Sequence, residues 1–380
     1  MSRDPRQLET LLRLAIVPGI GPARLAALLA RFGGADRVLA ATPGQIAEVP
    51  GFGREFARRI ASAGTAEGLG RARAAMKALR RIGAVALTAE DEEYPPAFRA
   101  LPDPPVVLYA LGDIHLLNDP GVGIVGTRTP TDYGCRTAAG LSRELTRAGY
   151  VIVSGMARGI DAVAQAAALD SGGATVGVLG QGVDRVYPPE NAPLFARVRE
   201  RGLLISELPP GEEPLAGNFP RRNRLIAALS AGVLVVEMGE KSGARHTVDY
   251  ALELGREVFA VPGPIGSPSS AGTNQLLKEG ARLVTSARDI LEELQGVGLP
   301  LRPASGQPPT ADPDLPSRMP PADLAPDEAR VFEQLGEGPR HVDDLAAAAG
   351  LATSAALTAL LGLELRELAE ALPGKQFRLR

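Results

Sequence analysis

Residues 218–227, NFPRRNRLIA, place three arginines beside an apolar run. Arg221, Arg222 and Arg224 could bind an anion, because a guanidinium group matches the geometry of phosphate and carboxylate. Phe219 adds a ring on which a nucleobase could stack. The structural alternatives are a solvated helix edge for each arginine and a core position for the ring. Cations combined with an aromatic ring are typical of a surface that binds single-stranded nucleic acid.

Two other loops could contribute to the same surface. Each follows a short apolar run that is typical of a buried strand. Parallel strands end at one edge of an open α/β sheet, which is where such folds bind ligands. Amides, hydroxyls and guanidinium groups there would suit a phosphate. The candidates are Gly126, Thr127, Arg128, Ser154, Gly155 and Arg158, although Arg158 could instead pair with Asp161.

The glycines of GVGIVG also match the dinucleotide fingerprint G-x-G-x-x-G. In a dinucleotide site the strand precedes the first glycine and the helix begins within the motif. Here Val122 to Val125 are themselves the strand, and the helix cannot begin before about Pro130. The spacing therefore argues against a dinucleotide cofactor.

No residue pattern indicates catalysis or a metal site. The three histidines are scattered along the sequence, and Cys135 has no neighbouring base. Asp161, Glu207 and Glu237 stand at strand or loop ends, where we expect them to order loops or to pair with arginines. We therefore expect no catalytic residue, no cofactor and no metal ion.

Residues 84–295 alternate β-branched runs with helical patterns, as a doubly wound sheet requires. Most of the runs are apolar throughout, which indicates burial on both faces. The expected fold class is α/β, with a Rossmann-like doubly wound sheet. The expected strands are VVLYALG, VGIVGT, YVIVSG, ATVGVLG, LLISEL, GVLVVEM, EVFAVPG and ARLV.

Residues 1–83 form a separate helical domain in this interpretation. VPGIG at Val17–Gly21 returns as VPGFG at Val49–Gly53, and a helical pattern follows each copy. This resembles the helix-hairpin-helix module, whose glycines let backbone N–H groups approach a DNA phosphate. The alternative is a compact helical bundle with no ligand. Residues 1–84 hold 14 Lys/Arg against 6 Asp/Glu, net +8. This charge favours DNA, including duplex DNA, and the cations that follow the turns are Arg24, Arg54, Arg58 and Arg59.

The C-terminal part divides into a linker and a small domain. Residues 296–322 contain eight prolines, which is typical of an extended linker. Residues 323–380 predict three short helices and a terminal hairpin, a winged-helix outline. The presumed recognition helix, TSAALTALLGLELRE, is apolar and acidic, and the domain carries a net charge of -4. This favours a protein-interaction module over a reader of the DNA major groove.

Composition indicates a cytoplasmic protein. The 380 residues include one cysteine, which excludes an internal disulfide. No apolar run approaches the roughly 20 residues of a membrane span, and the N-terminus has no signal-peptide core. We therefore expect no membrane partner.

Taken together, the motifs resemble the DprA family (DNA processing protein A, also called Smf). IVGTR, VIVSGMARGIDAVAQ, GVDRVYPPEN, FPRRNRLIAALS, SGARHT and REVFAVPG occur in this order and cover roughly residues 90–290. The resemblance implies a cytosolic, dimeric protein that binds single-stranded DNA. It also implies that the protein loads the RecA recombinase on that DNA in natural transformation and recombination, with no enzymatic step.

The resemblance assigns roles residue by residue. The family's phosphate loop falls on Gly126, Thr127 and Arg128, its second loop on Ser154 and Gly155, and its arginine motif on Phe219, Arg222, Asn223 and Arg224. Arg221 is an addition of this sequence. The family's dimer surface maps to Leu252, Leu276, Leu277 and Leu283.

Two departures from the family pattern stand out. The family usually has Ala-His where Ala164-Gln165 stands, so no histidine is available there. It also has a more apolar SG-S-L-x-T where SGARHT stands, which places Arg245 and His246 near the site. The second departure affects the expected details of DNA contact or dimer packing.

Two other functions compete with this interpretation. Related Rossmann-like phosphoribohydrolases process nucleotides with a catalytic glutamate in PGG-x-GT-x-x-E, and SGARHTVDY lacks both the second glycine before Thr247 and a matching Glu. A pure scaffold would need no arginine cluster. Both alternatives therefore fit the sequence less well than a protein that binds single strands.

Overall fold

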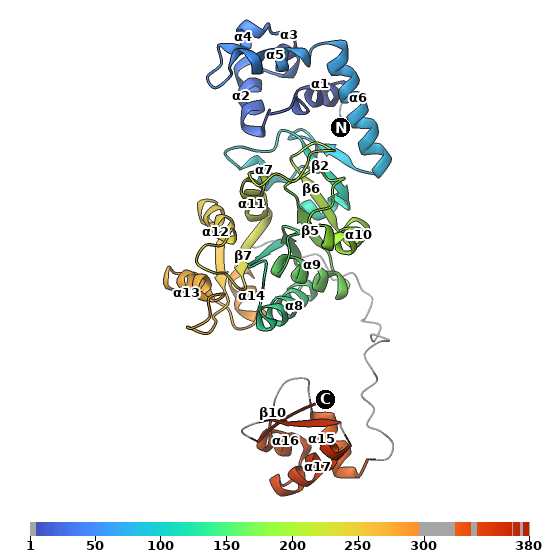
Figure 1. The fold of residues 1–380 in the computed structure, drawn as a ribbon, viewed down its shortest axis with the longest axis vertical. Coiled ribbons are helices and arrows are strands. Elements are labelled where there is room, and N and C mark those ends of the chain that lie inside the picture. The colour runs from blue at the N-terminus through green and yellow to red at the C-terminus, as the bar shows by residue number, and fades with distance from the viewer. Residues whose placement is uncertain (1–4, 296–323, 336–339, 367, 373–374, 380) are drawn as a thin grey trace. The chain divides into compact units, whose positions relative to one another are not determined.

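The computed structural model describes residues 5–295, 324–335, 340–366, 368–372 and 375–379. The chain divides into two compact units, residues 1–306 and 307–380. The Pro-rich linker expected at residues 296–322 lies outside the described residues. Figure 1 labels most of the helices and some of the strands.

The first unit begins with helices packed around a core of their own. Leu14, Leu28, Ile46 and Ile60 are fully buried in this core. Proline stands at the start of several of these helices, where its missing N–H costs no hydrogen bond. The helices are α1 (Pro5–Ala15), α2 (Pro22–Phe32), α3 (Ala35–Ala40), α4 (Pro43–Ala47), α5 (Arg54–Ser62) and α6 (Ala66–Ile82).

The two VPGxG sequences form the same turn. In each, the residue after the middle glycine donates to the carbonyl of the first valine, at 3.0 Å in the first copy and 3.1 Å in the second. The middle glycines, Gly19 and Gly51, have φ of +86° and +84°. This left-handed conformation costs a residue with a Cβ about 1–2 kcal/mol. Because the turns lead into α2 and α5, the sequence echo is a structural repeat, and the expected pair of helix-hairpin-helix turns is confirmed.

Among the described residues, nine strands form one sheet in the order β1-β2-β6-β5-β4-β3-β7-β8-β9. The seven strands from β6 to β9 are parallel, and β2 and β1 extend the sheet in antiparallel pairing. The chain runs from β3 to β6 in one direction and returns to β7 on the other side of β3. The strands are β1 (Val85–Leu87), β2 (Leu108–Gly112), β3 (Gly121–Val125), β4 (Val151–Ser154), β5 (Thr175–Val178), β6 (Leu203–Ser206), β7 (Ser230–Val235), β8 (Glu257–Ala260) and β9 (Arg282–Leu283).

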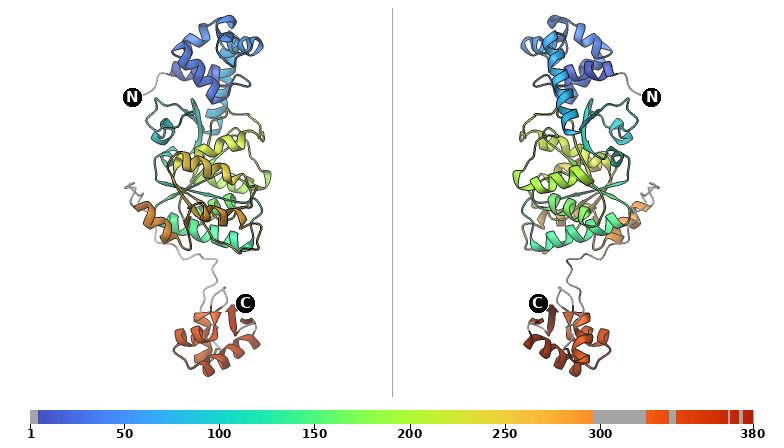
Figure 2. Two further views of the ribbon diagram at one scale, coloured as in Figure 1. Left: turned by 90° about the vertical axis from the view of Figure 1, so that its left-hand side faces the viewer. Right: turned by 90° about the vertical axis from the view of Figure 1, so that its right-hand side faces the viewer.

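Helices cover both faces of this sheet (Figure 2). Side chains of α11 (Asn218–Leu229), α12 (Ala244–Glu253) and α13 (Ala271–Lys278) join the core on one face. Those of α8 (Asp132–Arg147), α9 (Ile160–Asp170) and α14 (Ala287–Gln295) join the core on the other. The doubly wound, Rossmann-like fold is therefore confirmed, with each of the eight expected strands present. The shorter elements are α7 (Pro96–Arg99), α10 (Ala192–Arg201), and the 3-10 turns η1 (Ile114–Leu117) and η2 (Pro189–Asn191).

A fourth core joins the N-terminal helices to the sheet. Leu12 of α1 and Leu79 of α6 share this cluster with Tyr109 of β2 and Leu194 of α10. All four side chains are buried. The N-terminal helices and the sheet are therefore packed on one another within the first unit.

The second unit is the winged-helix domain. Helices α15 (Pro326–Gln334), α16 (Val342–Ala349) and α17 (Thr353–Leu365) stand with the strands β10 (Arg340–His341), β11 (Ala369–Leu372) and β12 (Gln376–Leu379). Leu345, Leu360 and Leu363 are fully buried in its core. The expected three helices and terminal hairpin are thus confirmed.

No single helix in the described part of the chain is long and apolar enough to cross a membrane. The helices α16 and α17 pass that test only as a pair bent by 103°.

Candidate nucleic-acid interface

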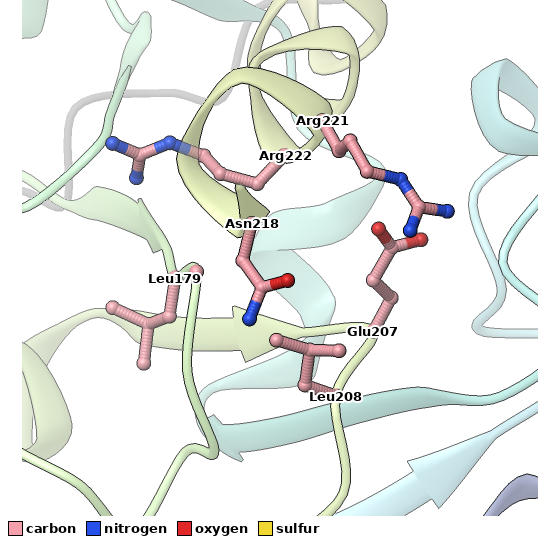
Figure 3. A pocket seen from close by; sticks show the side chains of 7 residues that line it. Leu179, Glu207, Leu208, Asn218, Arg221 and Arg222 are labelled. Carbon is pink, nitrogen blue, oxygen red and sulfur yellow. The ribbon is translucent and has the colours of Figure 1, made fainter. Parts of the chain in front are cut away.

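The arginines of NFPRRNR leave α11 in different directions. Figure 3 shows Arg221 and Arg222 on opposite sides of the helix, although they are adjacent in sequence. Successive residues are about 100° apart around a helix axis, so neighbours cannot share one face. Arg221 is exposed, whereas Arg222 and Arg224 are 5% and 4% exposed. One cationic run therefore supplies one surface arginine and two buried ones.

Arg222 ties the ends of two strands to α11. Its guanidinium donates to the carbonyl of Gly155 after β4 at 2.6 Å, to the carbonyl of Val178 in β5, and to Oδ1 of Asn223 at 3.0 Å. A Cβ at position 155 would collide with this guanidinium, so only glycine fits there. Burial lowers the pKa of Arg222 to about 10, and the nearby Asp161 carboxylate opposes the shift. The side chain stays charged at neutral pH and acts as a clamp.

Arg224 forms a buried ion pair. Its guanidinium donates to Glu207 Oε2 at 2.6 Å and to Asp103 Oδ2 at 3.1 Å. Burial raises the pKa of Glu207, and Arg224 opposes this rise. The pair holds the loop after β6 and the segment before β2 against α11. Direct contact of Arg222 and Arg224 with DNA stays a prediction, because their partners in the structure are protein groups.

Glu237 orders the loop after β3. It accepts from the Thr131 amide at 2.9 Å and from the Thr131 hydroxyl at 2.5 Å. Its own carbonyl accepts from the Thr127 amide at 2.8 Å. The Thr127 amide is therefore already occupied, and the loop presents the exposed guanidinium of Arg128 instead. Arg128 makes no hydrogen bond or salt bridge within the described residues, and the same holds for Arg221.

The start of the loop after β4 is buried, and its polar groups have hydrogen-bond partners within the protein. The Ser154 hydroxyl donates to the Ile124 carbonyl at 2.6 Å, and the Gly155 amide donates to Asp161 at 3.0 Å. Burial raises the pKa of Asp161, with Arg222 the main opposing group. Arg158 forms a salt bridge with Glu190 rather than with Asp161. This loop therefore has a supporting role, and its exposed cation, Arg158, is already paired with Glu190.

Two rings lie side by side at the end of β5. The centroids of Phe219 and Tyr187 are 5.5 Å apart and their planes make an angle of 31°. Phe219 packs against Gly180, and the Tyr187 side chain is 38% exposed. Sequence reasoning found Phe219 but gave no role to Tyr187, which stands in the quoted run GVDRVYPPEN. Nothing in the local pattern shows that these two rings meet.

The pocket beneath α11 is very small. It measures about 10 Å³, room for about one water, and Glu207, Asn218, Arg221 and Arg222 line it (Figure 3). A bound nucleotide needs a cavity of several hundred Å³. No group of three or more metal-ligating side chains occurs in the described residues. The edge of the sheet is therefore a surface on which an extended ligand could lie.

The second helix-hairpin-helix turn adds an open groove of about 640 Å³. Phe52, Gly53, Arg54 and Arg58 line it, together with Glu48. Both arginines are exposed. The groove was not predicted as such, although its cations and its glycine were.

The first turn has different surroundings. Arg24 donates to the Gly19 carbonyl at 3.3 Å and lies 5.1 Å from the centroid of the Phe56 ring, and Arg59 lies 5.2 Å from the same ring. A Cβ at Gly21 would lie 3.2 Å from Nη1 of Arg221. The first turn therefore adjoins the arginine of α11 at the sheet edge.

At both departures from the family pattern, the side chain that stands there bonds to other protein groups. Gln165 is buried; its Oε1 accepts from the Met156 amide at 3.1 Å and its Nε2 donates to the Thr175 hydroxyl at 3.1 Å. Arg245 pairs with Asp249 at 2.9 Å and with Glu279 at 2.8 Å. Gln165 of α9 thus joins the loop after β4 to β5, and Arg245 joins α12 to the end of α13.

The leucines expected at a dimer surface differ in burial. Leu252 on α12 and Leu283 on β9 are 58% and 54% exposed. Leu277 is half-buried, and Leu276 belongs to the core under the sheet. Leu252 and Leu283 are therefore the two that are free to meet a partner.

Comparison with known proteins agrees with this architecture. The family model for DNA recombination-mediator protein A matches residues 85–295, more than half of the chain. Models for the DprA winged helix domain and for a SAM-like helix-hairpin-helix tandem match residues 315–375 and 9–63.

Individual relatives cover the chain widely. Protein Smf of Synechocystis is 36% identical over 96% of both chains. The crystal structure of DNA processing protein A from Streptococcus pneumoniae is 33% identical, with a TM-score of 0.65, over 77% of this chain and 99% of that one. DNA processing protein A from Helicobacter pylori, described for its single-stranded DNA binding mode, is 36% identical, with a TM-score of 0.51, over 56% of this chain and 96% of that one. This chain therefore belongs to the DNA recombination-mediator protein A family, the DprA/Smf proteins.

Proposed function

We propose that this protein binds single-stranded DNA along the carboxyl edge of its parallel strands and loads the RecA recombinase on it in natural transformation and recombination. One observation carries the proposal. Arg128 and Arg221 are exposed at this edge without a hydrogen bond or salt bridge in the described residues, and the Tyr187–Phe219 pair stands at the same edge. The Helicobacter pylori relative, described for binding single-stranded DNA, supports it.

In this proposal the exposed arginines contact DNA and the buried arginines support the loops. Arg128 can pair with a phosphate without giving up a protein partner. The exposed guanidinium of Arg221 lies near the Glu207 carboxylate (Figure 3), but the ion pair of that carboxylate is with Arg224. Arg222 and Arg224 hold the strand ends in place, because their guanidinium groups bind the Gly155 carbonyl and the Glu207 carboxylate. In this proposal they act on DNA through the loops they hold.

The rings provide a contact that does not depend on base identity. Stacking of a base on an aromatic side chain contributes about 1–3 kcal/mol. The exposed Tyr187 ring, backed by Phe219, is available for such a contact. A shallow surface with rings and cations therefore suits a single strand of any sequence.

Arg128→Ala tests the phosphate contact. Binding of single strands should weaken about tenfold at moderate salt for every sequence, and the slope of log affinity against log salt should become shallower by about 1. Fluorescence anisotropy with labelled oligonucleotides at several salt concentrations measures both quantities.

The matched control is Arg147→Ala, which removes an exposed charge from the last turn of α8, at the opposite edge of the sheet. An equal loss in both variants would show a net-charge effect and no site at Arg128. Unchanged affinity in Arg128→Ala would remove the central contact from the proposal.

We also propose a homodimer that uses the exposed Leu252 and Leu283. Two copies related by a two-fold axis would bury these side chains and place two DNA edges on one longer strand. Leu283→Glu on the edge strand β9 should give a folded monomer in sedimentation experiments. Val85→Glu on the opposite edge strand β1 is the control and should stay dimeric. A dimeric Leu283 variant would place the interface elsewhere.

The proposed function includes no bond-making step. Asp161, Glu207 and Glu237 are engaged by a backbone amide, an arginine and a threonine respectively. The pocket beneath α11, at about 10 Å³, is too small to hold a nucleotide. No contact among the described residues therefore favours the phosphoribohydrolase alternative.

The N-terminal helices are proposed to add a contact for duplex DNA. The groove at the second turn combines a glycine-rich turn with exposed Arg54 and Arg58, within a segment of net charge +8. Backbone amides and cations together suit phosphates of either form of DNA.

A further inference from the structure

The loop at residues 262–270, which follows β8, carries an isoleucine that touches almost nothing. Ile265 is 98% exposed. Single apolar side chains on a protein surface are common and need no explanation by themselves. Ile265 differs from such side chains because its loop is held by hydrogen bonds and lies next to the loop that carries Arg128.

This loop is held firmly at both ends. The side chain of Asn274 accepts from the Gly263 amide at 3.2 Å and donates to the Gly263 carbonyl at 3.0 Å. Farther along, the Met238 amide donates to the Ser269 carbonyl at 2.8 Å, and the Gly272 amide donates to the Met238 carbonyl at 2.7 Å. An ordered loop thus presents an apolar tip that the protein itself leaves uncovered.

The loop adjoins the phosphate loop through Tyr133. The Tyr133 hydroxyl donates to the Pro262 carbonyl at 3.1 Å, and its ring is 42% exposed. Tyr133 lies in the first turn of α8, directly after the loop that carries Arg128. Tyr133 and Ile265 are therefore two exposed apolar groups on the β8 side of Arg128.

The strand order gives this arrangement a symmetry. Strands β5 and β8 each lie two positions from β3, on opposite sides of it. At a strand spacing of about 4.8 Å, each is roughly 10 Å from β3 across the sheet. Arg128 follows β3, the Tyr187–Phe219 pair stands at β5, and Ile265 follows β8. The cation is thus flanked by an apolar surface on either side.

We infer that Tyr133 and Ile265 form a second surface for nucleobases, so that one single strand crosses Arg128 with bases on both sides of it. This inference rests on the proposed function. The ligand proposed here is a base, because the exposed tip of the loop is the apolar Ile265 and residues 262–270 contain no cation to pair with a phosphate. A tyrosine ring and an isoleucine both bury the faces of bases without reading their identity.

The sequence offers a direct reporter for this contact. The chain contains no tryptophan and six tyrosines. Ile265→Trp therefore introduces a single tryptophan at the loop tip, which can be excited selectively at wavelengths that tyrosine does not absorb. A thymidine oligonucleotide of about 20 nucleotides, longer than the roughly 4–16 nucleotides that one OB fold binds, should quench this tryptophan by stacking. An abasic strand of the same length should bind without quenching it. Val85→Trp on β1, at the far end of the sheet, is the control and should not respond.

Affinity gives a second, independent measurement. Ile265→Asp should weaken binding of the thymidine strand about five- to tenfold and leave binding of the abasic strand within about twofold. Ile265→Leu should bind as the wild type does. Because Ile265 is almost fully exposed, thermal unfolding of all three variants should match that of the wild type.

The possible outcomes distinguish a failure of single-strand binding from a failure of the second base surface alone. If the wild type binds no single strand, the proposed function fails. If Arg128→Ala weakens binding, but DNA leaves the fluorescence of the Ile265→Trp variant unchanged and Ile265→Asp binds normally, only the second base surface is wrong. If Ile265→Asp binds DNA normally but loses a contact with RecA, the loop tip belongs to a protein interface, which also overturns the inference.

Discussion

The two helix-hairpin-helix turns share a motif and a backbone conformation but have different surroundings. Around the first, Arg24 and Arg59 lie over the Phe56 ring, and Arg221 of α11 adjoins Gly21. At the second, Arg54 and Arg58 line an open groove. The same motif thus forms the same turn twice, but the neighbours of each turn give it a different role. The first copy belongs to the junction with the sheet, and the second is free to meet a ligand.

The largest expected effect tests whether the two turns are equivalent. Gly19→Ala and Gly51→Ala should each lower the free energy of unfolding by about 1–2 kcal/mol, since both glycines have a left-handed φ. The effects should be similar, because a Cβ at Gly19 would make only an ordinary contact with Phe56 at 3.4 Å and one at Gly51 would meet nothing within 4 Å. Chemical denaturation measures both. A loss confined to one variant would mean that the turns are not structural repeats.

The next effect concerns the groove. The double variant Arg54→Ala, Arg58→Ala should bind duplex DNA about tenfold more weakly, because two phosphate contacts are removed. Binding of single strands should change by less than about twofold, since the sheet edge is untouched. Gel shifts with matched single-stranded and duplex probes measure the difference.

The control for the groove is Arg80→Ala, Arg81→Ala, which removes the same charge from exposed positions in the last turn of α6. An equal loss of duplex binding in the control would assign the effect to net charge. Deletion of residues 1–83 is a poorer test, because Leu12 and Leu79 pack against the sheet and their loss would expose its core.

The smallest effect compares the equivalent glycines Gly21 and Gly53. Gly21→Ala should weaken binding of single strands about two- to threefold, because its Cβ would displace Arg221 from 3.2 Å. Gly53→Ala should leave single-strand affinity unchanged, since nothing lies within 4 Å of its Cβ position. Equal affinities in the two variants would show that Arg221 is not a contact or moves without cost.

Local patterns predicted most of the fold. Continuous apolar runs identified eight strands, and the VPGxG echo identified the repeated turn, because strand burial and turn conformation depend on neighbouring residues. The strand β1 was missed. It has three residues, Val85–Leu87, pairs with β2 in antiparallel register at the edge of the sheet, and is too short to show a period.

The candidate site was predicted in composition more than in geometry. Arg128, Phe219 and the arginine run were identified from their types and spacing. Their directions were not predicted, because a run of adjacent cations does not show which one faces solvent. The exposed arginines are Arg128 and Arg221, while Arg222 and Arg224 are buried among protein acceptors.

The elements, the family resemblance and the residue types at the strand ends could be read from the sequence, since these depend on short-range patterns. Which side chains meet could be read only from the folded chain. It placed Tyr187 against Phe219, Arg221 beside Gly21, and Ile265 on the far side of Arg128 from the two rings. The physical reason is that these neighbours come from segments far apart in the chain. Strand order and helix packing bring them together, and neither is written in the spacing of any single motif.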